Sequence, residues 1–208
     1  MNIQEAIEQL RQETIDTLTP TLTEEQTQVV FAAGDPTSPL MLVGEAPGPQ
    51  EDQQGTPFVG PSGKLLESAL TQLGLTRDQL WISNTVKVWP NTRNGRSLKT
   101  RPPQAAEKKA SRPFFEREIE LIRPKAILCL GGTAAQAVID KSFKITQERG
   151  QWREGPHDTP TMATFHPSYI LRLQGMAPAD GAAALQSFID DLRLAAQRAG
   201  LLKEQDDG

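Results

Sequence analysis

The chain has 208 residues and a net charge of −4, and it is 37% hydrophobic, 23% charged and 5% aromatic. This length suits one domain over residues 1–208, and the lack of an apolar run of about eighteen residues excludes a membrane-spanning helix. The single cysteine excludes an internal disulfide framework and a cysteine-ligated metal cluster. With one cysteine and an acidic, amphipathic N-terminal stretch unlike a signal peptide, we expect a cytoplasmic location. The acidic net charge argues against a protein that coats nucleic acid non-specifically.

The N-terminal part of the chain, residues 1–39, is predicted to be a helix and a connection. Apolar residues at near-helical spacing over 3–18 indicate an amphipathic helix that packs on the outside of the core. Residues 20–39 are rich in Thr, Gln, Pro and Gly and indicate a connection, apart from the apolar stretch 29–33. We expect the core of the fold to follow at 40–199.

The core begins with an apolar run, 40–43, that has the length and composition of a buried strand. A helix then starts with Ser62 as its N-cap and ends before Gly74. The remaining predicted elements are, in chain order, a strand at 80–87, a long loop at 88–103, a helix at 104–122, a strand at 126–130, a short helix at 133–139, a hairpin arm at 144–152, a strand at 161–165, a helix at 182–199 and a frayed tail at 203–208. Because strands alternate with helices, we predict an α/β fold with a central parallel four-stranded sheet flanked by helices on both faces.

A loop rich in glycine and proline follows the strand at 40–43. It carries three carboxylates, Glu45, Glu51 and Asp52, and one aromatic ring, Phe58. In α/β sheets, the loop that leaves the carboxyl end of a strand is where ligands usually bind. A rigid loop with acids and one ring suits a small planar ligand, whereas most loops of this composition are solvated surface loops. A second loop decides between these interpretations.

This second loop contains His166, which lies directly after the strand predicted at 161–165 and before Pro167. A proline biases the preceding residue away from the helix, which keeps His166 at the exit of the strand. A lone histidine in such a place is more often structural. Parallel strands end at the same edge of a sheet, however, so we expect five residues to converge on one pocket there: Glu45, Glu51, Phe58, Asn84 and His166. Such a set suits recognition of the edge of a nucleobase.

Positive charge is concentrated in residues 87–112, which hold eight basic residues and one acid, Glu107. One interpretation of this segment is a solvated loop and helix face. The other is a local phosphate-binding strip, because contacts to phosphates contribute affinity without sequence information.

Six stretches match a known family in order and spacing: G-E-A-P-G-P-Q-E-D at 44–52, G-T-P-F-V-G-P-S-G at 55–63, S-N-T-V-K at 83–87, E-L-I-R-P-K-A-I-L-C-L-G at 120–131, I-T-Q-E-R-G-Q-W at 145–152 and F-H-P-S-Y-I-L-R at 165–172. These motifs resemble those of the uracil-DNA glycosylase superfamily, and of its family 4 branch in particular. The resemblance implies a DNA repair enzyme with its catalytic core at 40–199. Such an enzyme flips uracil out of DNA and hydrolyses its N-glycosidic bond, which leaves an abasic site.

The resemblance also implies which residues contact the base. Phe58 would stack on the flipped base, and Gly44 and Ala46 would line the same site. Asn84 would read N3 and O4 of uracil, since its amide offers both a donor and an acceptor. His166 would donate a hydrogen bond to O2, where negative charge grows as the glycosidic bond breaks.

A carboxylate on the sugar side would stabilise the sugar cation and position water. In family 1 enzymes that acid follows the residue that matches Glu45, and this chain has Ala46 in its place. The task would therefore fall to Glu45 or Glu51, of which we favour Glu45. The residues predicted to contact DNA are Lys87, Arg96, Lys99, Arg101, Pro167, Ser168 and Arg172.

Three departures from family 4 stand out. Its members carry an iron–sulfur cluster on four cysteines, two of which would lie at about Val88 and Ser111, so this chain would bind no such cofactor. The loop between these positions is longer and basic, and it resembles that of a uracil-crosslinking branch, but Leu98 replaces the crosslinking histidine and no covalent trapping is expected. The segment after Arg172 is Ala-rich and departs from the usual Lys-containing stretch.

Two other functions stay open. The loss of the cluster cysteines favours a module that binds damaged DNA without cleavage, although a pure binder has no need of Glu45, Asn84 and His166 together. The other is a glycosylase that prefers hypoxanthine or xanthine. Asn84 argues only in part against it, because the side-chain amide can flip. In each case we expect a monomer that binds single- or double-stranded DNA and makes no contact with membranes. For the glycosylase, this DNA contains uracil.

Overall fold

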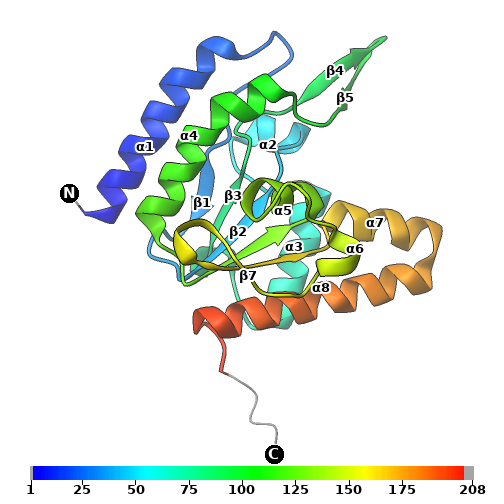
Figure 1. The fold of residues 1–208 in the computed structure, drawn as a ribbon. Helices are drawn as coiled ribbons and strands as arrows, with labels where there is room; N and C mark the ends of the chain where they lie inside the picture. Colours follow the sequence, from blue (N-terminus) through cyan, green and yellow to red (C-terminus); the bar gives the residue numbers. More distant parts are fainter. Residues whose placement is uncertain (1, 204–208) are drawn as a thin grey trace, which may run out of the picture.

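The computed structural model describes residues 2–203, and Figure 1 shows the fold. The helices are α1 (Ile3–Leu18), α2 (Pro49–Gln54), α3 (Pro61–Gln72), α4 (Ala105–Ile122), α5 (Gly132–Val138), α6 (Ile145–Glu148), α7 (Pro167–Met176) and α8 (Pro178–Ala199). The strands are β1 (Ala32–Gly34), β2 (Leu40–Gly44), β3 (Trp81–Asn84), β4 (Asn91–Asn94), β5 (Ser97–Thr100), β6 (Ala126–Leu130), β7 (Arg153–Glu154) and β8 (Pro160–Thr164). Short 3-10 turns lie at η1 (Thr19–Thr21), η2 (Arg77–Gln79) and η3 (Pro156–Asp158).

Within the described residues, six strands form one sheet in the order β1-β3-β2-β6-β8-β7. Its inner strands β3, β2, β6 and β8 are parallel, and the edge strands β1 and β7 pair antiparallel with their neighbours. The predicted parallel four-stranded core is therefore confirmed. The two edge strands have three and two residues, which is too short for a periodic pattern in the sequence.

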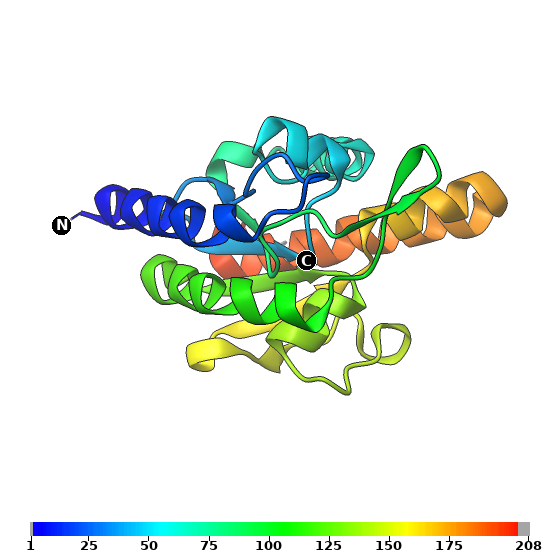
Figure 2. The same cartoon turned by 90° about the horizontal axis from the view of Figure 1, so that it is seen from above.

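Helices cover both faces of the sheet, because successive strand residues point to opposite sides. Leu40, Leu42 and Leu128 pack with residues of α3 and α8, whereas Met41 and Val43 pack with residues of α1, α4 and α5. Figures 1 and 2 show α1 and α4 side by side, with α8 on the other side of the sheet. The sheet is thus the middle of three layers, and the carboxyl ends of its parallel strands share one edge.

Several predicted elements agree closely with the structure. The predictions at 3–18 and 126–130 match α1 and β6, and the prediction at 104–122 differs from α4 by one residue. The terminal helix starts earlier than predicted, at Pro178, because proline is well suited to the first position of a helix. Of the predicted frayed tail, residues 204–208 lie outside the described residues. Among residues 2–203, none of the helices is long and apolar enough to span a bilayer.

Four local predictions are corrected by the structure. The N-cap of α3 is Gly60 and not Ser62, because Pro61 takes the first helical position. The hairpin arm at 144–152 is wrong, because its first half is the short helix α6 and β7 begins beyond it. The strand at 80–87 ends at Asn84. The loop at 88–103 contains a hairpin, β4–β5, whose turn holds an Asn-Gly pair that is typical of tight hairpins, with Gly95 at a φ of 62°.

Candidate functional site

All four parallel strands end at one cavity of about 740 Å³. Glu45 follows β2, Asn84 ends β3, Gly131 follows β6 and His166 follows β8. The lining also includes Ala46, Gly48, Gln50, Glu51, Phe58, Gly60, Pro61, Ser62, Thr100, Arg101, Leu130, Thr133, Ser168 and Arg172. The expected convergence of Glu45, Glu51, Phe58, Asn84 and His166 is therefore seen. What each of them does stays a prediction.

The amide of Asn84 is aimed at this cavity from the end of β3. Asn84 is 2% exposed, and its Oδ1 has no hydrogen-bond partner within residues 2–203. A Cβ added at Gly44 would lie 2.3 Å from that oxygen and 2.6 Å from Cζ of Phe58. Glycine at position 44 therefore makes room for both side chains. A buried amide oxygen without a partner is costly, which indicates that a ligand completes its bonding.

The imidazole of His166 is held as a neutral donor. His166 is the N-cap of α7, where its Nδ1 accepts a hydrogen bond from the Ser168 N–H at 3.1 Å and lies 2.7 Å from the Ser168 hydroxyl. The ring proton is thus placed on Nε2. Burial and the positive charge of Arg172 lower the pKa of His166 to about 4, and Glu51 opposes this shift. At neutral pH the ring carries no charge and offers one N–H donor, at Nε2.

We expect nitrogen chemical shifts of the imidazole to show His166 neutral, with its proton on Nε2, down to a pH near 4. Between the ordinary histidine pKa of 6.5 and 4, the unfolded chain binds a proton that the folded chain does not. The contribution of His166 to the free energy of unfolding therefore falls as the pH is lowered through this range. A His166 ring that titrates near 6.5 would contradict this placement, and the exposed His157 serves to assign the second histidine signal.

The two candidate carboxylates differ in what holds them. The Glu51 carboxylate accepts hydrogen bonds from the N–H groups of Gly48 (3.1 Å), Val59 (2.9 Å) and Gly60 (2.8 Å), so its oxygens are occupied. Glu45 lines the same cavity with no such backbone bonds in the described part of the chain. Burial raises the pKa of Glu45, and the charge of Lys108 opposes the shift. Of the two carboxylates that line the cavity, Glu45 is the one whose oxygens have no bonded partner within residues 2–203.

The predicted phosphate contact of Lys87 is wrong, because its side chain is fully buried. Its ammonium pairs with Glu118 of α4 and donates to the Phe31 carbonyl at 3.1 Å and to the Ser83 hydroxyl at 2.7 Å. Burial lowers the pKa of Lys87, and the Glu118 carboxylate opposes that change. Lys87 lies within the fold and cannot contact an outside partner.

The other predicted phosphate contacts lie at or near the cavity. Arg96 and Lys99 are exposed on the β4–β5 hairpin, which projects from the body of the molecule in Figures 1 and 2. The guanidinium of Arg101, at the base of the hairpin, bonds both oxygens of Glu107 at 2.7 and 2.8 Å. Ser168 and Arg172 of α7 line the cavity. Pro167 is buried at the start of the same helix, which leaves its ring little surface for a contact.

The residues at the expected cluster positions do not fit an iron–sulfur cluster. The side chain of Val88 packs in an apolar cluster with Leu18 and offers no ligand atom. The Ser111 hydroxyl accepts a hydrogen bond from the Lys87 N–H at 3.0 Å. Cys129 is buried in β6, where burial raises the pKa of its thiol. Within residues 2–203, no three His, Cys, Asp or Glu side chains are grouped to hold a metal ion.

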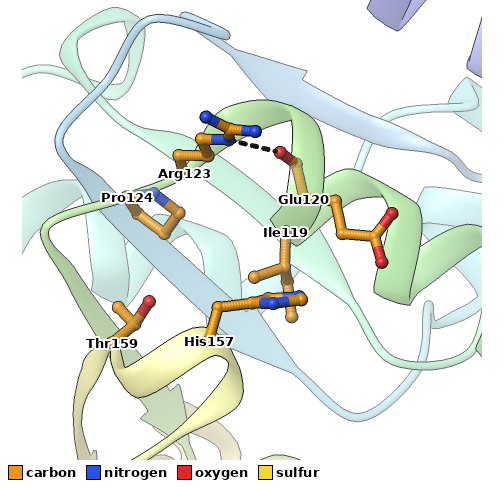
Figure 3. A pocket seen from close by; sticks show the side chains of 6 residues that line it. All are labelled: Ile119, Glu120, Arg123, Pro124, His157 and Thr159. Carbon is orange, nitrogen blue, oxygen red and sulfur yellow. Dashed lines mark hydrogen bonds between the residues drawn. The ribbon is translucent and has the colours of Figure 1, made fainter.

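A second cavity of about 490 Å³ lies near the amino ends of β6 and β8, between the end of α4 and η3 (Figure 3). Figure 3 shows His157 beside Ile119, and Arg123 Nε donating to the Glu120 carbonyl at 3.3 Å. His157 and Arg123 are both exposed. This cavity holds no predicted site residue, so the larger cavity is the candidate site.

Gly131, which the sequence analysis does not assign to the site, shapes the larger cavity. Gly131 has a φ of 100°, and a Cβ there would lie 2.9 Å from Cβ of His166. Its missing side chain therefore allows the imidazole to lie beside the end of β6. The signal in the sequence is the pair Gly131-Gly132 directly after the apolar run at 126–130.

Comparisons with known proteins agree with this site. The family described as "Uracil DNA glycosylase superfamily" matches residues 31–193. The chain is 34% identical over 175 residues to the "Type-4 uracil-DNA glycosylase" of Sulfurisphaera tokodaii, which covers 80% of this chain and 76% of the relative. It is 38% identical over 151 residues to the protein of the same name from Thermotoga maritima, and the match covers 71% of this chain and 73% of the relative. The Archaeoglobus fulgidus protein of that name is 34% identical over 153 residues, with 70% and 73% covered.

Proposed function

Because the chain belongs to the uracil-DNA glycosylase superfamily, we propose that it is an enzyme that excises uracil from DNA and leaves an abasic site. The observation that carries this proposal is the buried Asn84 amide, whose Oδ1 has no hydrogen-bond partner within residues 2–203, in one cavity with the neutral His166 imidazole and the Phe58 ring. In this proposal one domain acts as a monomer on single- or double-stranded DNA in the cytoplasm. Extrusion of a base costs a few kcal/mol and is easiest at a mismatch or in a single strand.

Asn84 selects uracil in this proposal. Its Oδ1 accepts from N3–H of the base, and its Nδ2 donates to O4. Cytosine presents the reverse order of donor and acceptor, so it would leave both groups unpaired in a buried place. Unpaired polar groups of this kind allow strong discrimination between substrates. The Phe58 ring, against Gly44, provides the stacking face for the flipped base.

His166 and Glu45 carry out the bond cleavage. As the C1′–N1 bond breaks, its electron pair moves to the uracil ring, and the Nε2–H of His166 stabilises the negative charge at O2. Glu45 stabilises the positive charge on the sugar and takes a proton from the water that adds to C1′. Burial raises the pKa of Glu45, which suits a group that accepts a proton. Glu51 has no part in this step, because its carboxylate is bonded to the backbone.

The exposed residues beside the cavity bind the phosphates. Arg96 and Lys99 on the hairpin are free of ion pairs within residues 2–203, and Arg172 and Ser168 lie at the cavity itself. Arg101 would have to exchange its bonds to Glu107 for a phosphate, so we give it a supporting role at the base of the hairpin.

We expect the double variant Arg96→Ala/Lys99→Ala to weaken binding of DNA by a similar factor for every sequence. The slope of log K against log salt should fall by about two, since two phosphate contacts are lost. Fluorescence anisotropy over a series of salt concentrations measures both quantities. The variant Lys125→Ala/Lys141→Ala makes the same change of charge at exposed residues outside the cavity and should leave the slope unchanged. Equal slopes for both variants would show that the hairpin does not contact DNA.

A panel of oligonucleotides separates this proposal from its two alternatives. The panel contains U·G and U·A pairs, single-stranded U, a T·G pair and hypoxanthine, and alkali-labile sites are measured after incubation. A uracil-DNA glycosylase produces them at uracil. A binding module retains the DNA without producing any, and a glycosylase of shifted preference produces them at hypoxanthine in place of uracil.

A further inference from the structure

The backbone of Phe58 has an unusual conformation. Its φ is 55°, in the left-handed region that residues with a side chain rarely adopt. The ring is 5% exposed, and its centroid lies 6.2 Å from that of His166 at an interplanar angle of 36°. A conformation of this kind persists only where neighbouring groups hold it.

Two opposite charges hold the turn at residues 57–60. On one side, the two terminal nitrogens of Arg77 donate to the carbonyls of Phe58 and Pro57, the second at 2.6 Å. On the other side, Oε1 of Glu51 accepts from the N–H groups of Val59 (2.9 Å) and Gly60 (2.8 Å). Successive peptide groups of the turn are thus bonded by one cation and one anion.

The two charged residues come from different parts of the chain. Glu51 lies on α2, before the turn, whereas Arg77 lies on η2, directly before the strand that ends at Asn84. Helix α3 closes the third side, because a Cβ at Gly63 would lie 1.8 Å from the Phe58 carbonyl oxygen. Arg77 therefore connects the turn to the element that positions the amide.

We propose that Arg77 and Glu51 are positioning residues, which hold the Phe58 ring in the orientation that stacks on the flipped base. This proposal rests on the proposed function, and it assigns Glu51 to the ring and not to the water. The planar fork of arginine reaches two carbonyls at once, which a lysine ammonium does not match. A carboxylate accepts two N–H bonds at one oxygen, whereas the amide of glutamine can turn a donor towards them.

The test is a double-mutant cycle between Arg77 and Phe58, with KM and kcat for excision of uracil from a single-stranded oligonucleotide. We expect Arg77→Gln to raise KM by about tenfold with a smaller change in kcat, since stacking is lost in ground state and transition state alike. Phe58→Leu keeps the apolar volume but removes the aromatic face. In that background, Arg77→Gln should raise KM no further. Arg77→Lys keeps the positive charge but cannot match the planar fork that bonds both carbonyls, so it should give an intermediate KM.

The control is Arg193→Gln, which breaks a solvent-accessible pair with Asp190 on α8, outside the basic segment, and should leave KM unchanged. An equal rise in KM in the wild-type and Phe58→Leu backgrounds would overturn the proposal, and so would an unchanged KM in Arg77→Gln. If Arg77→Gln does not fold, the cycle with Arg77→Lys decides by the same criterion. A wild-type protein that releases no uracil refutes the proposed function, whereas an active wild type with additive effects refutes only the role of Arg77.

Discussion

Replacement of His166 by alanine should lower the rate of uracil excision by about 10²–10³-fold, which is the usual effect of removing one pre-aimed donor from a developing negative charge. Nδ1 of His166 is occupied by Ser168, so Nε2–H is the group left to face the base. The imidazole is neutral near pH 7, which makes it a donor whose strength does not depend on protonation in that range. Single-turnover excision from a U·G oligonucleotide measures the effect on the chemical step.

His157→Ala is the matched control, because the second histidine of the chain is exposed at the other cavity. It should keep the full rate. Since His166 also caps α7, the unfolding midpoint of each variant shows whether the protein is folded at the assay temperature. A folded His166→Ala protein with the rate of His157→Ala would show that the imidazole does not act on the base.

Replacement of Glu118 by alanine should lower the free energy of unfolding by about 3–5 kcal/mol, the range for removing one partner of a buried ion pair. Lys87 would keep a charge in a fully buried place, with the Phe31 carbonyl and the Ser83 hydroxyl as its remaining partners. The indole N–H of Trp81, 3.2 Å from the Glu118 carboxylate, would lose its acceptor as well. Chemical denaturation monitored by circular dichroism measures the loss.

Two further variants give this prediction its controls. Glu116→Ala removes an exposed carboxylate from the same helix and should change the free energy of unfolding by less than about 1 kcal/mol. Lys87→Met/Glu118→Leu removes both charges and should be more stable than Glu118→Ala, because it leaves no unpaired charge in the core. If Glu118→Ala is no less stable than Glu116→Ala, the buried pair does not contribute in the way that its burial indicates.

The parallel core of the fold could be predicted because its strands are continuous apolar runs, as in 40–43 and 126–130. The alternation with helices then placed the strand ends at one edge, and Pro167 placed His166 outside the following helix. These local rules were sufficient to bring Asn84, His166, Glu45 and Glu51 to one cavity. The edge strands could not be predicted, since β1 and β7 owe their conformation to pairing with β3 and β8.

Other parts of the site depend on contacts between distant residues. Lys87 stands in a basic stretch, and its burial follows from Glu118, which lies on the next helix. Glu51 and Glu45 are both glutamates in the same loop, and the sequence does not distinguish them. In the structure, the N–H groups of residues 59 and 60 bond to the Glu51 carboxylate. Arg77 carries no motif at all, and its bonds to the turn of Phe58 are evident only in three dimensions. Residue type and spacing therefore indicated where the site lies. Contacts between distant residues determined which carboxylate and which cations have no bonded partner within residues 2–203.

The central claim is that one cavity recognises a flipped uracil and cleaves its glycosidic bond. The most direct measurement is the amount of free uracil released from a U·G oligonucleotide by the wild-type protein and by Asn84→Ala, with abasic sites counted in parallel. We predict one uracil and one abasic site per substrate for the wild type, and a large loss of release for Asn84→Ala. Wild-type protein that leaves the uracil in place, or an Asn84→Ala variant with the full rate, would contradict the claim.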